Sequence, residues 1–323
     1  MWLKATAVAH PIQGLIKYHG LRDPKRRIPY HDSISVCIQA LTTTTTVETV
    51  DQQKKDEIVV NGKELAGNNR KRVEIVLKEL KRKAGFSGSL KVISVNSLLA
   101  GKGLGFSASG FAALGSATAK SLNLDPDRVF LSETVRLGAG SSTRSLAGNF
   151  AIWYANKDGR SYAERLKVSE NLDFSMVIVP IHSDIKTDEA HAEVLSSPLF
   201  KERCRNVSKL LKTMKLAIQK GETDAIGHLA EEDTLNLHAI TMTGATHMVL
   251  WEPDTVRVMK EVIRMRDDGI AAWYSMDTGP SVFINTYRRN AKIIEKCLRK
   301  IGFDNVILSG VGGRPLLTTN HLF

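Results

Sequence analysis

Three short segments, far apart in the chain, carry side chains that could act together on an anion. Lys17 ends an apolar run and is followed by Gly20, so a cation lies where the chain turns and can approach a ligand closely. Arg144 follows three small hydroxyl residues at the expected start of a helix, where free backbone N–H groups and a planar guanidinium favour a bound carboxylate. Asp277 follows an expected strand and precedes a Thr-Gly-Pro turn. Together these residue types predict an anion site with electrostatic chemistry.

Each of these residues also has a structural interpretation. Arg144 could form a salt bridge with Glu133, and Asp277 could cap its own turn. Lys17 could be an ordinary surface lysine, although its context is apolar. His191 and His238 are more typical of structural histidines than of ligands, and no Cys/His spacing indicates a metal site.

The elements that must position these residues alternate between strands and helices. Residues 42–50, with the sequence TTTTTVETV, predict a strand with a solvent-facing side. Residues 101–122 predict a glycine-rich loop that enters a helix of small apolar residues. Further strands are expected at 33–41, 57–60, 90–95, 176–181, 271–275 and 306–309, and further helices at 69–84, 125–137, 206–220, 223–242, 255–267 and 287–301, with one more starting near residue 143.

Composition sets the broad class. The 323 residues can bury a large core and predict two domains or lobes, with 42% hydrophobic and 24% charged residues. The net charge of +11 is scattered, and its densest run, at 70–83, predicts a solvated helix face, so no nucleic-acid partner is expected. No apolar run is long enough to span a bilayer and no signal peptide is visible, and three widely spaced cysteines are typical of reduced thiols; we therefore expect a cytoplasmic protein without membrane contact.

The segments LIKYHG, SSTRSLAG and SMDTGPSVF, which hold Lys17, Arg144 and Asp277, resemble the mevalonate-pathway decarboxylases of the GHMP kinase superfamily. The resemblance covers nearly the whole chain. It implies an α+β, GHMP-kinase-like fold of two lobes with a cleft between them. The expected lobes are 1–175, with a degenerate phosphate loop, and 176–323, with exchange of segments at the boundary. The resemblance also implies a homodimer.

The resemblance assigns catalytic roles to three residues. Arg144 is expected to hold the C1 carboxylate of a phosphorylated mevalonate, and Asp277 to face its C3 oxygen. Lys17 is expected beside Asp277, holding it ionised and offering positive charge to a phosphate. Further substrate contacts are expected from Tyr18, from His19 in the place of the family's common tryptophan, and from Ser141, Ser142 and Ser107.

Fewer cations than usual face the C5 end of the expected substrate. Leu21 stands where diphosphate decarboxylases usually carry a second lysine, which predicts a C5 monophosphate. Lys186 and Arg72 are the candidates for that phosphate, and Lys102 for a phosphate at C3.

The kinase signature of the superfamily is altered at three positions. Leu99 replaces a proline, Phe106 replaces the first serine of the phosphate loop, and Ala139 replaces a serine near Arg144. These losses favour a decarboxylase that needs no ATP, metal or other cofactor, and that converts mevalonate 3,5-bisphosphate to isopentenyl phosphate with release of phosphate and CO2. The alternatives are an ATP- and Mg²⁺-dependent phosphomevalonate decarboxylase and a non-catalytic binding protein. The former nucleotide cleft is expected either to collapse into the core or to accept an apolar ligand.

Overall fold

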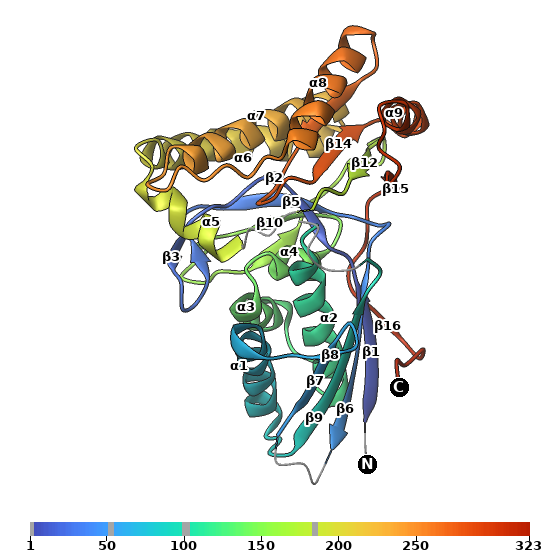
Figure 1. Ribbon diagram of the computed structural model, residues 1–323. Coiled ribbons are helices and arrows are strands. Elements are labelled where there is room, and N and C mark those ends of the chain that lie inside the picture. The colour runs from blue at the N-terminus through green and yellow to red at the C-terminus, as the bar shows by residue number, and fades with distance from the viewer. Residues whose placement is uncertain (1–2, 51–54, 99–103, 183–186) are drawn as a thin grey trace.

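The computed structural model describes residues 3–50, 55–98, 104–182 and 187–323. It has the mixed helix and sheet architecture that the resemblance implied (Figure 1). None of the described helices is long and apolar enough to cross a lipid bilayer.

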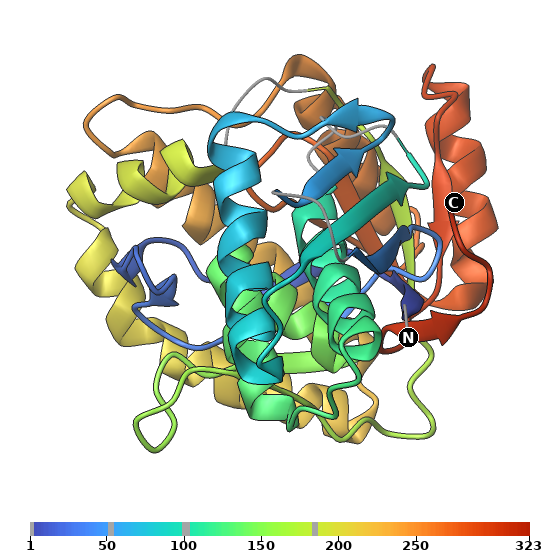
Figure 2. The same cartoon turned by 90° about the horizontal axis from the view of Figure 1, so that it is seen from below.

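A six-stranded sheet with the order β16-β1-β6-β9-β7-β8 forms the part that holds the chain ends. The red C-terminal end of the chain lies beside the blue strand β1 in both views, as the antiparallel pairing of β1 with β16 requires (Figure 1, Figure 2). Helix α2 packs on β1 and β6, and α1 packs against α2 and α3. The bounds are β1 (Lys4–Ala9), β6 (Thr43–Val50), β7 (Glu57–Val60), β8 (Lys63–Glu64), β9 (Ser89–Asn96), β16 (Leu316–Thr318), α1 (Gly67–Ala84), α2 (Phe106–Ser121) and α3 (Arg128–Gly138).

The threonine-rich strand β6 lies inside this sheet. One of its sides is buried, and the other carries the partly exposed Thr44, Glu48 and Val50, in line with the expected solvent-facing side. The strand pairs antiparallel with β1 on one side and with β9 on the other. Two of its buried hydroxyls pair with neighbouring strands: Thr45 Oγ1 lies 2.9 Å from Ser94 Oγ, and Thr46 Oγ1 lies 2.7 Å from Thr6 Oγ1. Threonine therefore gives this strand β-branched packing and a second set of hydrogen bonds between neighbouring strands.

Two four-stranded sheets form the rest of the molecule, with orders β11-β10-β5-β2 and β13-β14-β12-β15. A small pair, β3-β4, and the helices α4 to α9 complete it. The strand bounds are β2 (Ile12–Ile16), β3 (Leu21–Asp23), β4 (Ile28–Pro29), β5 (Ser33–Cys37), β10 (Phe150–Trp153), β11 (Ala163–Arg165), β12 (Ser175–Val179), β13 (Ala272–Ser275), β14 (Val282–Thr286) and β15 (Ile307–Ser309). The helix bounds are α4 (Ser142–Ala147), α5 (Thr187–Glu193), α6 (Phe200–Lys220), α7 (Thr223–Met242), α8 (Pro253–Asp267) and α9 (Arg288–Lys300), with a 3₁₀ turn at Val194–Ser196.

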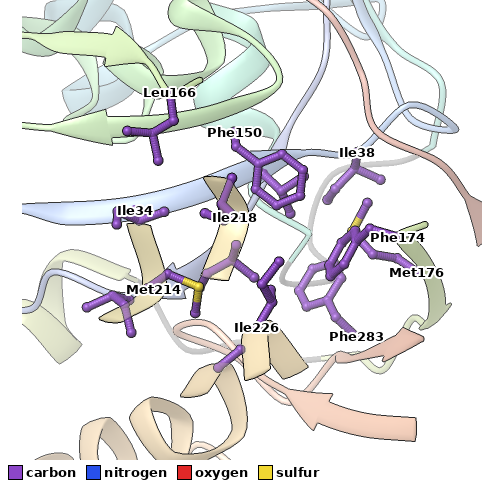
Figure 3. Packing of buried hydrophobic residues seen from close by; sticks show 14 of the residues in the cluster. Ile34, Ile38, Phe150, Leu166, Phe174, Met176, Met214, Ile218, Ile226 and Phe283 are labelled. Atoms are coloured by element: carbon purple, nitrogen blue, oxygen red, sulfur yellow. The ribbon is translucent and has the colours of Figure 1, made fainter. Parts of the chain in front are cut away.

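Strand β12 shows how the second half is layered. Successive side chains of a strand point to opposite faces. Met176 and Ile178 join the cluster that contains α6 and the β5-β10 strands, whereas Val177 and Val179 pack with α8 and α9. The first cluster contains residues from both halves of the chain and packs them together. Figure 3 shows its side chains, which come from several elements. A single well-packed core therefore holds β2, which carries the site described next, against α6 and α7.

Candidate active site

One cavity, of about 110 Å³, brings together the three residues that the sequence motifs singled out. It lies where β2, the start of α2, α4, α7 and the loop after β13 meet. Its lining is Ile12, Gly14, Lys17, Tyr18, Gly105, Ser107, Ser141, Arg144, His191, Leu237, Asp277 and Thr278.

Asp277 is held against the backbone of β2. The N–H of Gly14 donates to both carboxylate oxygens, at 3.1 and 3.2 Å. A Cβ at Gly14 would lie 2.9 Å from Oδ1 of Asp277 and 2.7 Å from Cγ of Lys17, so only glycine lets both side chains approach here. Burial raises the pKa of Asp277 above its ordinary value, and Lys17, the Gly14 N–H and Arg144 offset this effect only in part.

Lys17 lines the same cavity, but its ion pair within the described residues is with Asp233 of α7, 3.8 Å away. Its ammonium group also donates to Thr234 Oγ1 at 2.8 Å and to Ser275 Oγ at 3.0 Å. Lys17 lowers the pKa of Asp277, as expected of a neighbouring cation, but burial has the larger effect and the pKa remains above its ordinary value. Burial likewise lowers the pKa of Lys17.

A buried ion pair behind the cavity fixes Lys17, and sequence reasoning missed it. Arg203 of α6 donates to Asp233 Oδ1 at 3.0 Å and to the backbone oxygen of Lys17 at 2.6 Å. The other oxygen of Asp233 accepts the backbone N–H of Lys17 at 2.8 Å. Both charged side chains are fully buried, so the pair holds β2, α6 and α7 in one register. Their positions on the apolar faces of α6 and α7, three residues after Phe200 and Ala230 respectively, are the signal that could have found them.

Arg144 is 3% exposed, and its Nε and Nη1 atoms have no hydrogen-bond partner among the described residues. The guanidinium lies between aromatic rings, 5.3 Å from the centre of the Tyr18 ring and 5.9 Å from that of Trp153. Glu133, the alternative salt-bridge partner, pairs instead with Arg160 at 2.7 Å. A buried arginine with free donors facing a cavity is suited to bind an anion, because leaving such donors unpaired is costly.

The remaining candidate contacts separate into two groups. Tyr18, Ser141 and Ser107 line the cavity. Ser142 does not: it is fully buried, and its hydroxyl donates to the backbone oxygens of Val135 and Ala139 at the end of α3.

His19 and His191 each occupy the kind of place that was expected for the other. His19 is fully buried outside the cavity lining, where Nε2 lies 2.9 Å from the Ala190 oxygen and burial holds its pKa well below the ordinary value. His191, expected to be structural, lines the cavity and stacks on Tyr18 with the ring centres 4.9 Å apart. His191 comes from α5, which is distant in sequence from the motifs, so only the folded chain reveals its place. His238 is buried beside Trp251, as a structural histidine would be.

A second cavity, of about 240 Å³, lies between α1 and α2 and the strands β6, β7 and β9. Its walls are mostly apolar. Phe106 forms part of the wall, while Ala139 is buried and lines neither cavity. Arg72 also faces this second cavity, with its Nε donating to the Gly138 oxygen at 2.7 Å.

Three candidates cannot be placed, because Leu99, Lys102 and Lys186 lie outside the described residues. Ser107, in the first turn of α2, lines both cavities and marks the point where they meet.

Comparison with known proteins matches both halves of the chain. Residues 9–163 match the family of diphosphomevalonate decarboxylase-like N-terminal domains, and residues 186–306 match the mevalonate 5-diphosphate decarboxylase C-terminal domain. The chain is 38% identical to a phosphomevalonate decarboxylase of Haloferax volcanii over 96% of each protein. It is 26% identical to a mevalonate 3,5-bisphosphate decarboxylase of Thermoplasma acidophilum, over 88% of this chain and 71% of that protein.

Solved structures agree with these relatives. Mevalonate diphosphate decarboxylase from Staphylococcus aureus superposes with a TM-score of 0.93 at 28% identity and covers 98% of both chains. The enzyme from Enterococcus faecalis gives 0.90 at 27% identity, covering 98% of this chain and 99% of that one. The chain is thus an enzyme of the carboxy-lyase class with the expected α+β, GHMP-like fold, and the interpretation as a non-catalytic binding protein is wrong. It belongs to the mevalonate-pathway decarboxylases of the GHMP kinase superfamily.

Proposed function

We propose that this enzyme is an ATP-dependent phosphomevalonate decarboxylase. It phosphorylates the C3 hydroxyl of mevalonate 5-phosphate and then releases phosphate and CO2 to give isopentenyl phosphate. The observation that carries this proposal is the meeting of a charged cavity and a separate open cavity at Ser107. An acceptor beside Asp277 and a nucleotide in the second cavity would place the transferred phosphoryl group at the N-terminus of α2, where backbone N–H groups bind phosphate.

This proposal departs from the ATP-independent reaction that the sequence favoured. The substitution at Phe106 removes a hydroxyl, but the phenyl ring contributes to the wall of a cavity that stays open. The relative named phosphomevalonate decarboxylase is 38% identical, compared with 26% for the relative named for the 3,5-bisphosphate. The Enterococcus faecalis enzyme, which has the same fold, is described as binding ATP by a mechanism that mevalonate diphosphate mediates. These observations support a nucleotide site in this chain.

The first step requires an acceptor for one proton. With Arg144 binding the C1 carboxylate, the C3 hydroxyl would lie toward Asp277, the carboxylate of the same cavity. The pKa of Asp277 is raised toward neutral pH. Its carboxylate is therefore a stronger base than that of an exposed aspartate. As the C3 oxygen attacks the terminal phosphorus of ATP, its proton passes to Asp277 and ADP leaves.

The second step breaks two σ bonds and forms two π bonds, one between C2 and C3 and one in CO2. The C3–O bond breaks, the phosphate leaves with the electron pair, and positive charge develops at C3. The electrons of the C1–C2 bond then form the C2=C3 double bond, and the carboxylate departs as CO2. Lys17, held by Thr234 and Ser275, supplies fixed positive charge to the leaving phosphate. Preorganised charge of this kind usually provides the largest contribution to rate.

We propose a monophosphate at C5, because few lysine and arginine side chains of the enzyme are available to bind a phosphate group there. Leu21 occupies the position of the second family lysine, and Lys17 and Arg144 are the lysine and arginine in the described lining of the cavity. Lys186 remains the predicted contact for the C5 phosphate.

A second candidate is the ATP-independent decarboxylation of mevalonate 3,5-bisphosphate. It is favoured by Phe106 and Ala139, which remove two family hydroxyls from the phosphate loop and from the segment before α4. In that case the second cavity would be free for an apolar ligand.

Turnover with three substrates separates these functions. Purified enzyme is given mevalonate 5-phosphate with ATP and Mg²⁺, mevalonate 5-diphosphate with ATP and Mg²⁺, or mevalonate 3,5-bisphosphate alone. We expect CO2 release from the 5-phosphate with one ADP formed per CO2, and much slower turnover of the 5-diphosphate. CO2 release from the bisphosphate alone, with no ATP-dependent turnover of the 5-phosphate, would establish the second candidate instead.

A further inference from the structure

A third cavity, of about 610 Å³, lies on the other side of α4 from the active site. Thr143, Leu146 and Ala147 of α4 face this cavity, whereas Arg144 faces the catalytic one. The remaining walls come from α2, α3, β11 and the segment that precedes β16. Its size lies within the range of small-molecule sites, which is about 300–1,000 Å³.

Three arginines line this cavity without a carboxylate partner among the described residues. They are Arg128 at the start of α3, Arg165 at the end of β11, and Arg314 before β16. Within the described residues, no ion pair joins any of the three to an acid, and Arg314 Nε donates to the Ala147 oxygen at 3.1 Å. Glu164 is the acid in the lining, but Lys157 engages both of its oxygens, at 2.9 and 3.0 Å.

The guanidinium group of Arg314 lies close enough to the other two to be affected by their charges. The pKa of Arg314 is lowered by burial and then by the charges of Arg128 and Arg165. Like charges gathered around a cavity repel one another, and a bound anion would relieve this repulsion. Arginine is the side chain best suited to phosphate, because its planar donors can form paired hydrogen bonds.

Part of the remaining lining is apolar. Val129 and Leu131 of α3, Leu146 of α4, and two prolines, Pro126 and Pro315, contribute apolar surface to it. A ligand that only carried charge would leave these walls unused. We propose that this three-arginine cavity binds a small organic phosphate or diphosphate, with its phosphate on Arg128, Arg165 and Arg314 and a short apolar part against α3 and α4.

The test measures binding by calorimetry with three probes: butyl diphosphate, inorganic diphosphate and 1-butanol. We expect butyl diphosphate to bind more tightly than inorganic diphosphate, and 1-butanol to give no measurable heat. In the double variant Arg128→Gln/Arg165→Gln, butyl diphosphate should bind at least about tenfold more weakly. The matched control is Arg205→Gln, which removes one exposed charge from α6 and should leave binding unchanged.

The catalytic cavity also binds anions, so the same titration is made with Arg144→Gln. Retention of a butyl diphosphate site in that variant, together with its loss in the double variant, supports the proposal. The proposal is overturned if the wild-type enzyme does not bind the probe, or if the double variant binds it as tightly as the wild type. Loss of binding only in Arg144→Gln would place the probe in the catalytic cavity and also overturn it. Equal affinity for inorganic and butyl diphosphate would overturn the apolar part of the assignment. Thermal unfolding of each variant confirms that the fold is retained.

Discussion

The two cavities that meet at Ser107 are built in opposite ways. In the catalytic cavity, Lys17 and Arg144 are buried and Asp277 is partly buried, and backbone or buried side-chain groups fix Lys17 and Asp277. The neighbouring cavity has more than twice the volume, about 240 against about 110 Å³, and mostly apolar walls. The first should therefore be sensitive to any change of charge, and the second to a change of volume.

The largest effect is expected from Asp277→Asn. The variant keeps the shape of the side chain but removes the proton acceptor for the C3 hydroxyl. Turnover should fall by about 10²–10⁴, the usual contribution of general acid–base catalysis. The matched control is Asp254→Asn, which removes an exposed carboxylate from α8 and should leave turnover unchanged. Steady-state assays measure kcat for both variants. Near-normal turnover of Asp277→Asn would show that this carboxylate is not the proton acceptor and only caps its own turn.

Arg144→Lys should have the next largest effect. A lysine keeps the positive charge but cannot form paired hydrogen bonds with a carboxylate or fill the space between Tyr18 and Trp153. We expect kcat/KM to fall by about 10²–10³. Arg160→Lys, which changes an exposed arginine paired with Glu133, is the control and should behave as wild type. If the two lysine variants are equally active, positive charge alone is sufficient at position 144.

The sequence predicted the charged cavity better than the apolar one, for a physical reason. Catalytic side chains occur in short motifs with turn and helix signals, so Lys17, Arg144 and Asp277 could be recognised one by one. Whether a cleft is open depends on many side chains at once, and the substitution at Phe106 alone did not reveal it.

The same limit explains the errors in the fold. Most helices, and several buried strands, were predicted from their periodicity, and α7 has the expected bounds. Helix α6 begins at Phe200, six residues earlier than expected, where Phe200 packs in a cluster with Val194 and Ile240. Tertiary packing also decides that β6 is interior and that Arg203 pairs with Asp233, and no local pattern records such partners.

A change of volume should affect the second cavity selectively. Gly110 of α2 lines that cavity, and a Cβ at this position would meet no atom within 4 Å. Gly110→Leu should therefore fill the space without disturbing the packed core, and a helix favours leucine over glycine. If ATP binds there, its KM should rise by about tenfold, equivalent to about 1.4 kcal/mol.

Two comparisons make this third prediction specific. Gly110→Ala adds one carbon and should have a much smaller effect on the KM for ATP. Turnover of mevalonate 3,5-bisphosphate, if the enzyme accepts it, should not change in Gly110→Leu, because that substrate needs no nucleotide. An unchanged KM for ATP in Gly110→Leu would place the nucleotide elsewhere.

The smallest effect concerns the buried charge of Asp277 in the absence of substrate. Its pKa is raised in the folded enzyme, while the unfolded chain keeps the ordinary value of 3.8. As the pH rises above that value, the unfolded chain loses its proton first, so the wild type loses stability until the pH passes the folded pKa. The asparagine of Asp277→Asn does not titrate, and its side-chain oxygen can still accept the Gly14 N–H. The stability of this variant relative to wild type should therefore increase from pH 4 upward and then level off, by about 1.4 kcal/mol for each unit of the shift. Urea unfolding at several pH values measures this difference. Parallel curves for the two proteins would mean that Lys17, Arg144 and the Gly14 N–H compensate fully for the burial of this carboxylate.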